Sequence, residues 1–331
     1  MKAAVLHAAN DIRIEEYADP VAGPGEVVIR TKAAGLCSKT VRMMLGGGLP
    51  ARLPLIPGPE LAGEISTVGA GVRGFFPEEP VAVYSGGLLG VTVNGACAEL
   101  VRVPKEIVAA DGLVKLLNEE ISFEDAVMAE PLACTFASAR SNRMKEGQTV
   151  LIVGGGSVGL LHLKTAKWSG CKVLVADSNA TRLALAGQMG AAHLINTSSF
   201  RLYDEVMQLT GGRGADVVII SVLIPELVAD CLRLTAQGGV CSLSSISPEN
   251  EAGVDKTLLA ERQITLTGSC AATAADFRKC LQLIKEEAII VSDMISHRFP
   301  LDDLREAVEK SKNQELIRGI VTFGDMFSLS F

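Results

Sequence analysis

Thr149-Val-Leu-Ile-Val-Gly-Gly-Gly-Ser-Val-Gly159 is the stretch that decides the fold, and an apolar run from Leu160 to Trp168 follows it. The β-branched and apolar residues at its start predict a buried strand, and the run after it predicts a helix. Between them lie glycines in a G-x-G-x-x-G pattern. This pattern is typical of a turn that leads from a strand into a helix.

Each glycine of this turn has a distinct physical role. Gly154 permits the tight turn, Gly156 lets a pyrophosphate approach the backbone, and Gly159 lets the helix and strand pack closely. The N–H groups and positive dipole of the helix N-terminus favour phosphate binding, so Ser157 and Val158 join the candidate dinucleotide-binding residues. A turn of this kind that serves packing alone is the alternative.

Composition restricts the function classes. A chain of 331 residues predicts two domains, and 48% hydrophobic with 21% charged residues is typical of a soluble α/β protein. The net charge of -7 argues against nucleic acid as the main partner, although a local basic pocket remains compatible with it. We find no signal peptide and no segment long enough for a membrane span, so we expect a cytoplasmic protein without a membrane partner.

The expected secondary structure changes after the first hundred residues. Up to that point, short strands interrupted by Gly and Pro predict an irregular β barrel. A helix is predicted to start at Pro131, with Glu130 just outside it. After the glycine turn, six strands alternate with helices, which predicts a doubly wound parallel sheet. We therefore expect a barrel domain over residues 1–135 and 272–331, and a dinucleotide-binding domain over 136–271.

Asp177 strengthens the dinucleotide interpretation. It ends the second predicted strand, 18 residues after Gly159, where a carboxylate accepts hydrogen bonds from the adenosine ribose. A 2′-phosphate at this place would meet that carboxylate, so NAD(H) is favoured over NADP(H). Arg182 is the nearest cation and a further candidate for cofactor binding. The alternative for Asp177 is a turn residue or a helix cap.

Ordered motifs along nearly the whole chain resemble the medium-chain dehydrogenase/reductase family, nearest its polyol, threonine and secondary-alcohol dehydrogenases. The motifs include Gly35-Leu-Cys-Ser-Lys-Thr40, Pro57-Gly-Pro-Glu-Leu-Ala-Gly63, Ala129-Glu-Pro-Leu132, Gly154 to Gly159 and Gly214-Ala-Asp-Val-Val218. The resemblance implies an α/β protein with a GroES-like β-barrel catalytic domain, a Rossmann domain and a cleft between them for hydride transfer. It also implies a small-molecule substrate, a homodimer or homotetramer, Val222 and Ser244 beside the nicotinamide, and Arg318 on the pyrophosphate.

The zinc site that the family implies is altered here. Zinc-dependent members hold the metal with a Cys, a His from a Gly-His-Glu motif, and a Cys or Glu. Cys37 and Glu130 match two of these ligands, but Pro59 replaces the histidine and has no donor atom. A zinc held by Cys37, Glu60 and Glu130 remains an alternative, although we expect this site not to hold one. We also expect no structural zinc, because residues 84–94 replace the cysteine-bearing lobe and contain no cysteine.

Two cationic residues accompany the change at Pro59. Lys39 stands where the family has a proton-relaying Ser or Thr, and Arg42 stands where a His is often found. Our hypothesis is that Lys39 replaces the metal as electrophile and general acid/base, with its pKa lowered by partial burial, and that Cys37, Glu60 and Glu130 complete the catalytic set. Alternatively, Lys39 and Arg42 bind an anionic group on the substrate or cofactor.

Three functions remain open at this point. The first is an NAD(H)-dependent oxidoreductase that interconverts a secondary alcohol, such as a polyol or sugar derivative, and a ketone. The second is a zinc-independent reductase of an activated C=C or C=N bond, which loss of the histidine favours. The third is a catalytically silent dinucleotide-binding protein, because function belongs to a site and not to a fold.

Overall fold

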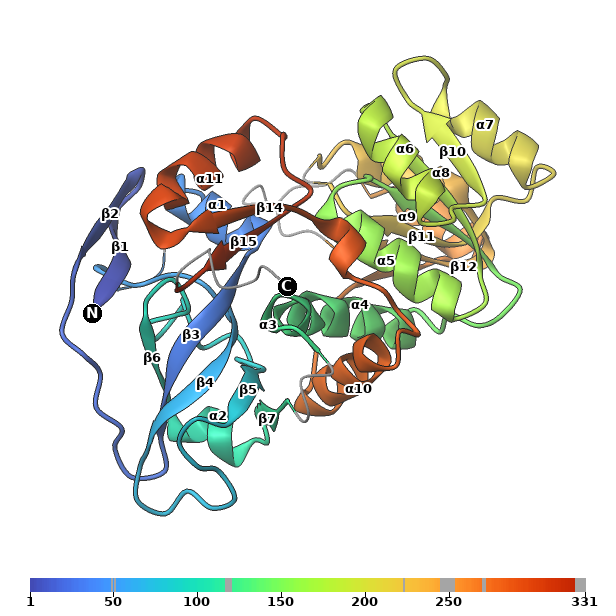
Figure 1. Cartoon of the computed structure of the whole chain (residues 1–331). Helices are drawn as coiled ribbons and strands as arrows, with labels where there is room; N and C mark the ends of the chain where they lie inside the picture. Colours follow the sequence, from blue (N-terminus) through green and yellow to red (C-terminus); the bar gives the residue numbers. More distant parts are fainter. Residues whose placement is uncertain are drawn as a thin grey trace. The chain divides into compact units, whose positions relative to one another are not determined.

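The computed structural model describes residues 1–48, 50, 52–116, 121–222, 224–244, 254–269 and 272–324 (Figure 1). Contacts divide the chain into two compact units. The first unit comprises Met1–Glu130 and Thr273–Phe331, and the second comprises Pro131–Ala272.

Mixed β structure makes up the first unit. Its strands are β1 (Lys2–Ala8), β2 (Asp11–Glu16), β3 (Val27–Leu36), β4 (Glu60–Val68), β5 (Pro80–Val83), β6 (Leu100–Val103), β7 (Leu113–Lys115), β14 (Ile295–Pro300) and β15 (Arg318–Thr322). β1 and β2 form an antiparallel hairpin, and the other strands form a seven-stranded sheet in the order β14-β15-β3-β4-β5-β7, with β6 also paired to β3. Only β14 and β15 pair in parallel in this sheet.

Short helices accompany this sheet. They are α1 (Ser38–Met44), α2 (Lys105–Ala109), α3 (Phe123–Val127), α10 (Ala274–Lys285) and α11 (Leu304–Lys312), with 3-10 turns at Ser292–Met294 and Leu301–Asp303. α1 buries Val41, Met43 and Met44 in the apolar core of the unit, to which β3 and β4 contribute Ile29 and Leu61. Only Cys37, the N-cap residue, lies between the end of β3 and the start of α1.

The second unit contains a six-stranded parallel sheet in the order β10-β9-β8-β11-β12-β13. Its strands are β8 (Thr149–Val153), β9 (Lys172–Asp177), β10 (His193–Asn196), β11 (Ala215–Ile220), β12 (Thr235–Leu243) and β13 (Thr265–Gly268). Its helices are α4 (Ala129–Ser141, from its third residue), α5 (Ser157–Trp168), α6 (Ala180–Gln188), α7 (Leu202–Leu209), α8 (Leu227–Leu234) and α9 (Lys256–Glu261).

This strand order confirms the doubly wound parallel sheet. From β8 the chain proceeds to β9 and β10 on one side, and then returns to β11, β12 and β13 on the other. The order reverses between β8 and β11. In sheets of this kind ligands bind outside the carboxyl ends of the strands at the reversal, which is where the glycine turn lies.

The predicted start of one helix was wrong. α4 begins at Ala129 and not at Pro131, so Glu130 lies in its first turn instead of outside it. A proline fits there because the first N–H groups of a helix have no intrahelical partner. β12 begins at Thr235. Gly238 and Gly239 interrupt the apolar pattern there, and the pairing with β11 shifts register between Ala215 and Val217.

None of the helices in the described ranges is long and apolar enough to cross a membrane.

Candidate active site and dinucleotide-binding site

The glycine turn approaches the neighbouring strand end too closely for larger residues. Gly154 has φ of 109°, in the left-handed region that favours glycine. A Cβ on Gly154 would lie 2.5 Å from Ser221 Oγ and 2.6 Å from the Val222 side chain. A Cβ on Gly159 would overlap the carbonyl oxygen of Gly154. Close packing therefore requires glycine at positions 154 and 159.

The turn leaves polar groups available at the start of α5. Gly156 is the N-cap residue and its position supplies no side-chain cap, while Ser157 and Val158 are the first two helical residues. The hydroxyl of Ser157 is buried and has no hydrogen-bond partner among the described residues. An uncapped helix N-terminus beside an unpartnered hydroxyl fits an anionic ligand such as a pyrophosphate.

The strand ends beside the turn carry the residues predicted near the nicotinamide. Val222 and Ser244 follow β11 and β12, which are adjacent in the sheet, and the Ser244 N–H donates to Ile220 O at 2.9 Å. The Ser244 hydroxyl is also buried without a partner in the described part of the chain. These residues and the turn thus lie along one edge of the sheet, and they fit a dinucleotide.

Asp177 lies against the glycine turn. Its Oδ2 accepts a hydrogen bond from the Gly155 N–H at 2.6 Å, and its Oδ1 accepts one from the Asn179 N–H at 2.7 Å. Arg182 Nη1 lies 4.0 Å from Oδ2, and the Asp177 side chain is 8% exposed. Each carboxylate oxygen has a second lone pair, so the group can still accept hydrogen bonds from a ribose.

Ser221 is a functional candidate that the sequence motifs do not identify. Its hydroxyl lies 3.0 Å from the carbonyl oxygens of both Val153 and Gly154, to which it donates. It thereby joins the end of β8 to the end of β11 at the reversal of strand order. The available signal was its position directly before Val222, which the family resemblance had already placed at the site.

In the first unit, Cys37 is the N-cap residue of α1. Its Sγ accepts from the Thr40 N–H at 3.4 Å and lies 3.1 Å from the Thr40 hydroxyl. Cys97 is close enough for the charge of Cys37 to affect it, and burial together with that charge raises the pKa of the Cys97 thiol to about 12. The thiol of Cys97 therefore stays protonated at neutral pH.

The expected partial burial of Lys39 was wrong. The residue is exposed, because α1 turns Val41, Met43 and Met44 into the core and leaves Lys39 and the half-exposed Arg42 on the other side. The two cations are three residues apart on one helix and therefore neighbours. Burial cannot be the means by which Lys39 would become reactive.

Glu130 interacts electrostatically with Lys39. Burial raises the pKa of the Glu130 carboxyl to about 7, and the positive charge of Lys39 opposes this rise. The carboxyl is partly buried in the first turn of α4, where the helix dipole also favours its charged form. Of the four predicted catalytic residues, Lys39 and Glu130 are therefore an ammonium and a carboxyl group that interact through their charges.

Glu60 and Arg318 form a buried ion pair. The Arg318 guanidinium donates to Glu60 Oε2, and the two side chains are 3% and 1% exposed. A Cβ on Gly35 would overlap Glu60 Oε2, so the glycine in β3 makes room for this pair. Arg318 was predicted on the pyrophosphate of the cofactor. In the structure Arg318 is the first residue of β15, and its guanidinium is bonded to Glu60, the first residue of β4.

The tentative zinc ligands do not fit a metal ion. No group of three His, Cys, Asp or Glu side chains in the described ranges is arranged to hold one. Glu60 is already paired with Arg318, Cys37 caps α1, and the residue before Glu60 is a proline without a donor atom. A catalytic zinc normally has three protein ligands that include an imidazole or thiolates. We therefore derive no step through a metal.

Comparison with known proteins agrees with this geometry. Residues 23–113 match the model of the alcohol dehydrogenase GroES-like domain, and residues 157–286 match that of the zinc-binding dehydrogenase. Sorbitol dehydrogenase of Bacillus subtilis is 26% identical over 94% of this chain and 93% of its own length, and (R,R)-butanediol dehydrogenase of the same organism is 28% identical over 95% and 98%.

Solved structures extend the agreement to the fold. The crystal structure of 2R,3R-butanediol dehydrogenase from Bacillus subtilis superposes with a TM-score of 0.88 at 26% identity and covers 98% of this chain and 99% of its own. Alcohol dehydrogenase from Thermus sp. ATN1 gives a TM-score of 0.88 at 22% identity, over 97% and 99% of the two chains. The first unit is thus a GroES-like domain, the second a Rossmann-like domain, and the chain is a dehydrogenase that belongs to the zinc-type medium-chain dehydrogenase/reductase family.

Proposed function

We propose that the protein is an NAD(H)-dependent oxidoreductase that interconverts a secondary alcohol, of polyol or sugar-like chemistry, and the corresponding ketone. The observation that carries this proposal is the glycine turn with Asp177 bonded back to it and the unpartnered hydroxyls of Ser157 and Ser244 beside it. The relatives named sorbitol dehydrogenase and (R,R)-butanediol dehydrogenase support the substrate class.

Asp177 supports NAD(H) over NADP(H). Its carboxylate is almost wholly buried and accepts hydrogen bonds from two backbone N–H groups at the place proposed for the adenosine ribose. A 2′-phosphate there would be repelled. The positive charge of Arg182 lies 4.0 Å from Asp177 and is partly neutralised by it, so Arg182 would attract a 2′-phosphate less strongly.

In this proposal Lys39 is the electrophile that polarises the substrate oxygen. Bound NAD(H) supplies or accepts the hydride at nicotinamide C4. In ketone reduction, the Lys39 ammonium donates a hydrogen bond to the carbonyl oxygen and then its proton to the alkoxide, and in alcohol oxidation the proton returns to the amine. The Glu130 carboxyl, whose pKa lies near 7, can exchange that proton with Lys39. Positioning of the substrate oxygen is thus assigned to this pair.

A reductase of an activated C=C or C=N bond is the second candidate. Pro59 supports it, because hydride addition to such bonds needs no Lewis acid at an alcohol oxygen. Lys39 would then protonate the atom next to the one that receives the hydride. The same assay separates the two candidates, since only one substrate class will turn over.

The test is product formation from a panel of polyols, ketones, enones and imines with NAD(H) and NADP(H), followed by Lys39→Met. We expect NAD(H)-linked turnover of a secondary alcohol, and a fall in kcat of about 10²-fold or more in the variant, because general acid/base catalysis supplies that much. Lys105→Met, at an exposed lysine of α2, is the matched control and should leave kcat unchanged. Near-normal turnover by Lys39→Met would exclude the catalytic role, and no turnover across the panel would exclude the function.

We also propose a homo-oligomer, a homodimer or homotetramer. The edge strand β13 supports this, because its outer backbone groups have no neighbouring strand in the six-stranded sheet. Light scattering would give the mass of the assembly in solution, and a monomeric mass would contradict the proposal.

A further inference from the structure

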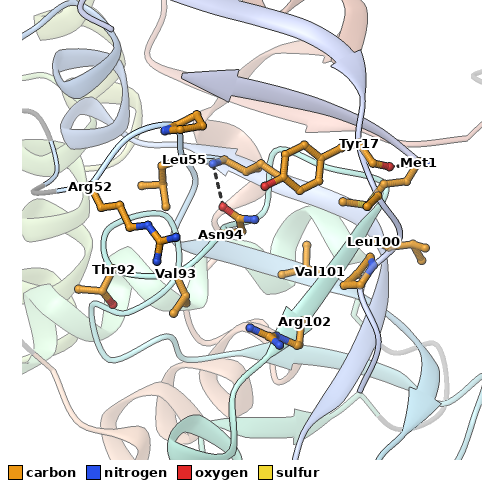
Figure 2. Close-up of a pocket in the computed structure, with 14 residues that line it drawn as sticks. Met1, Tyr17, Arg52, Leu55, Thr92, Val93, Asn94, Leu100, Val101 and Arg102 are labelled. Atoms are coloured by element: carbon orange, nitrogen blue, oxygen red, sulfur yellow. Dashed lines mark hydrogen bonds between the residues drawn. The ribbon is translucent and has the colours of Figure 1, made fainter. Parts of the chain in front are cut away.

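The first unit contains a pocket of about 350 Å³ that includes none of Cys37, Lys39, Glu60 and Glu130 (Figure 2). Its walls come from five segments of the chain: Met1, the residues directly after β2, the loop before β4, the loop before β6, and β6 itself. Its volume lies within the ~300–1,000 Å³ that is typical of small-molecule sites.

The inner surface of the pocket is apolar and firmly held. Leu55, Ile56 and Val101 line it and are 5%, 1% and 2% exposed. The Ile56 N–H donates to Asn94 Oδ1 at 3.1 Å, so the two loops are bonded across the pocket, as Figure 2 shows. Leu55 is further paired with Leu6 of β1 through two backbone hydrogen bonds. A ligand would therefore meet a site that is largely preformed.

The outer part of the pocket is cationic. Arg52 and Arg102 line it, both are exposed, and in Figure 2 their guanidinium groups extend from different segments towards the space between them. Among the lining residues there is no Asp or Glu. Arg52 forms no ion pair with a described residue, and Arg102 forms a long ion pair with Glu26, in which 3.8 Å between Nε and Oε2 is too far for a hydrogen bond.

Hydrogen-bonding groups stand between these two regions. Tyr17 contributes a phenol, Thr92 a hydroxyl, and Asn94 an amide whose oxygen is used by Ile56 and whose NH₂ group is a donor. Guanidinium groups bind carboxylate and phosphate oxygens in pairs, with a planar geometry that suits both anions. Two arginines in a pocket that no Asp or Glu lines favour a negatively charged ligand, although the chain as a whole has a net charge of -7.

We propose that this pocket is a second ligand site, which binds a small molecule with one carboxylate or phosphate group on a compact apolar body. Arg52 and Arg102 hold the anionic group, Asn94 and Tyr17 hydrogen-bond to it, and the apolar body lies on Leu55 and Val101. The site is independent of the proposed reaction, because it shares no residue with the catalytic set and lies wholly within the first unit.

Titration calorimetry of the whole chain with benzoate and with phenyl phosphate tests the proposal, and benzamide serves as the uncharged counterpart of benzoate. We expect saturable millimolar or tighter binding of at least one anion and none of benzamide. The stronger of the two anions identifies the favoured group. Arg52→Gln and Arg102→Gln should each weaken binding by about tenfold or more, because a charged hydrogen-bonding partner is lost.

Two control variants make the result specific. Arg73→Gln removes an exposed arginine outside the pocket and should leave the affinity unchanged. Arg182→Gln removes a cation of the predicted dinucleotide site and should also leave it unchanged. Three outcomes would each overturn the proposal. The first is equal affinity of the Arg52→Gln/Arg102→Gln double variant and the unaltered chain, and the second is loss of binding in Arg182→Gln instead. The third is the absence of saturable binding of either anion. Circular dichroism of each variant verifies that the fold is retained.

Discussion

The carboxylate of Asp177 accepts a hydrogen bond from the backbone N–H of Gly155 at 2.6 Å, across 22 residues of sequence. The end of β9 is thereby tied to the glycine turn after β8. The residue proposed to bind the adenosine ribose and the turn proposed to bind the phosphates are thus bonded to each other before any cofactor binds, which would lower the ordering cost of binding.

Asp177→Asn should therefore change cofactor preference. The substitution keeps the size of the side chain but removes its charge and one of its two acceptor oxygens. We expect the NADH affinity to fall by about tenfold, because hydrogen bonds to charged groups contribute about 1.5–3 kcal/mol, and the NADPH affinity to fall less or rise. Fluorescence titration with both cofactors measures this, with Asp204→Asn on α7 as the control. An unchanged ratio of the two affinities would show that Asp177 does not read the ribose.

The cofactor half of the fold could be predicted from the sequence because its determinants are local. A strand, three glycines and a helix within some twenty residues specify the turn, and Asp177 ends the next strand. The bond between Gly155 and Asp177 and the role of Ser221 could not be predicted in this way. Both depend on how neighbouring strands are aligned in the sheet, which sequence spacing does not fix.

Breaking the buried pair of Glu60 and Arg318 should destabilise the chain strongly. Glu60→Gln leaves the Arg318 charge buried without a counter-charge, so we expect the free energy of unfolding to fall by about 3 kcal/mol or more. Glu60→Met with Arg318→Met removes both charges and should recover much of that loss. Urea unfolding followed by circular dichroism measures each variant.

Glu64→Gln is the matched control for this prediction. Glu64 is on the same strand and pairs with Lys32 at 3.1 Å, but both side chains are 34% exposed. Such a pair contributes at most about 1 kcal/mol. Equal losses in Glu60→Gln and Glu64→Gln would mean that burial does not set the importance of the Arg318 pair.

The catalytic half was less predictable for a physical reason. The positions of Cys37, Lys39 and Glu130 were inferred from motifs, and these motifs say nothing about exposure. Lys39 is exposed because the apolar residues of α1 determine which side of that short helix enters the core. The Arg318 partner of Glu60 lies 258 residues away in sequence, and only the pairing of β15 with β3 and of β3 with β4 brings the two together.

The residues at the place of the family's catalytic zinc predict how the protein responds to chelation. Pro59 has no ligand atom and Glu60 is held by Arg318, so no tight zinc site can form from these residues. We expect elemental analysis of protein purified without chelator to give far less than one zinc per chain, and turnover to survive incubation with EDTA. Stoichiometric zinc whose removal abolishes turnover, and whose return restores it, would contradict this expectation.

His162 should make the stability of the second unit depend on pH. It is 2% exposed on α5, its Nδ1 has no partner among the described residues, and burial lowers its pKa from 6.5 to about 4. The folded chain therefore holds it neutral, while the unfolded chain binds a proton below pH 6.5. Stability is fully present above pH 6.5 and falls as the pH drops from there towards 4, by about 3 kcal/mol in total.

Trp168, the only tryptophan, ends the same helix, so its fluorescence during urea unfolding reports the change. His162→Leu should flatten this pH dependence, whereas His193→Gln on β10 should keep it. Parallel curves for His162→Leu and the unaltered chain would show that another group causes the acid lability.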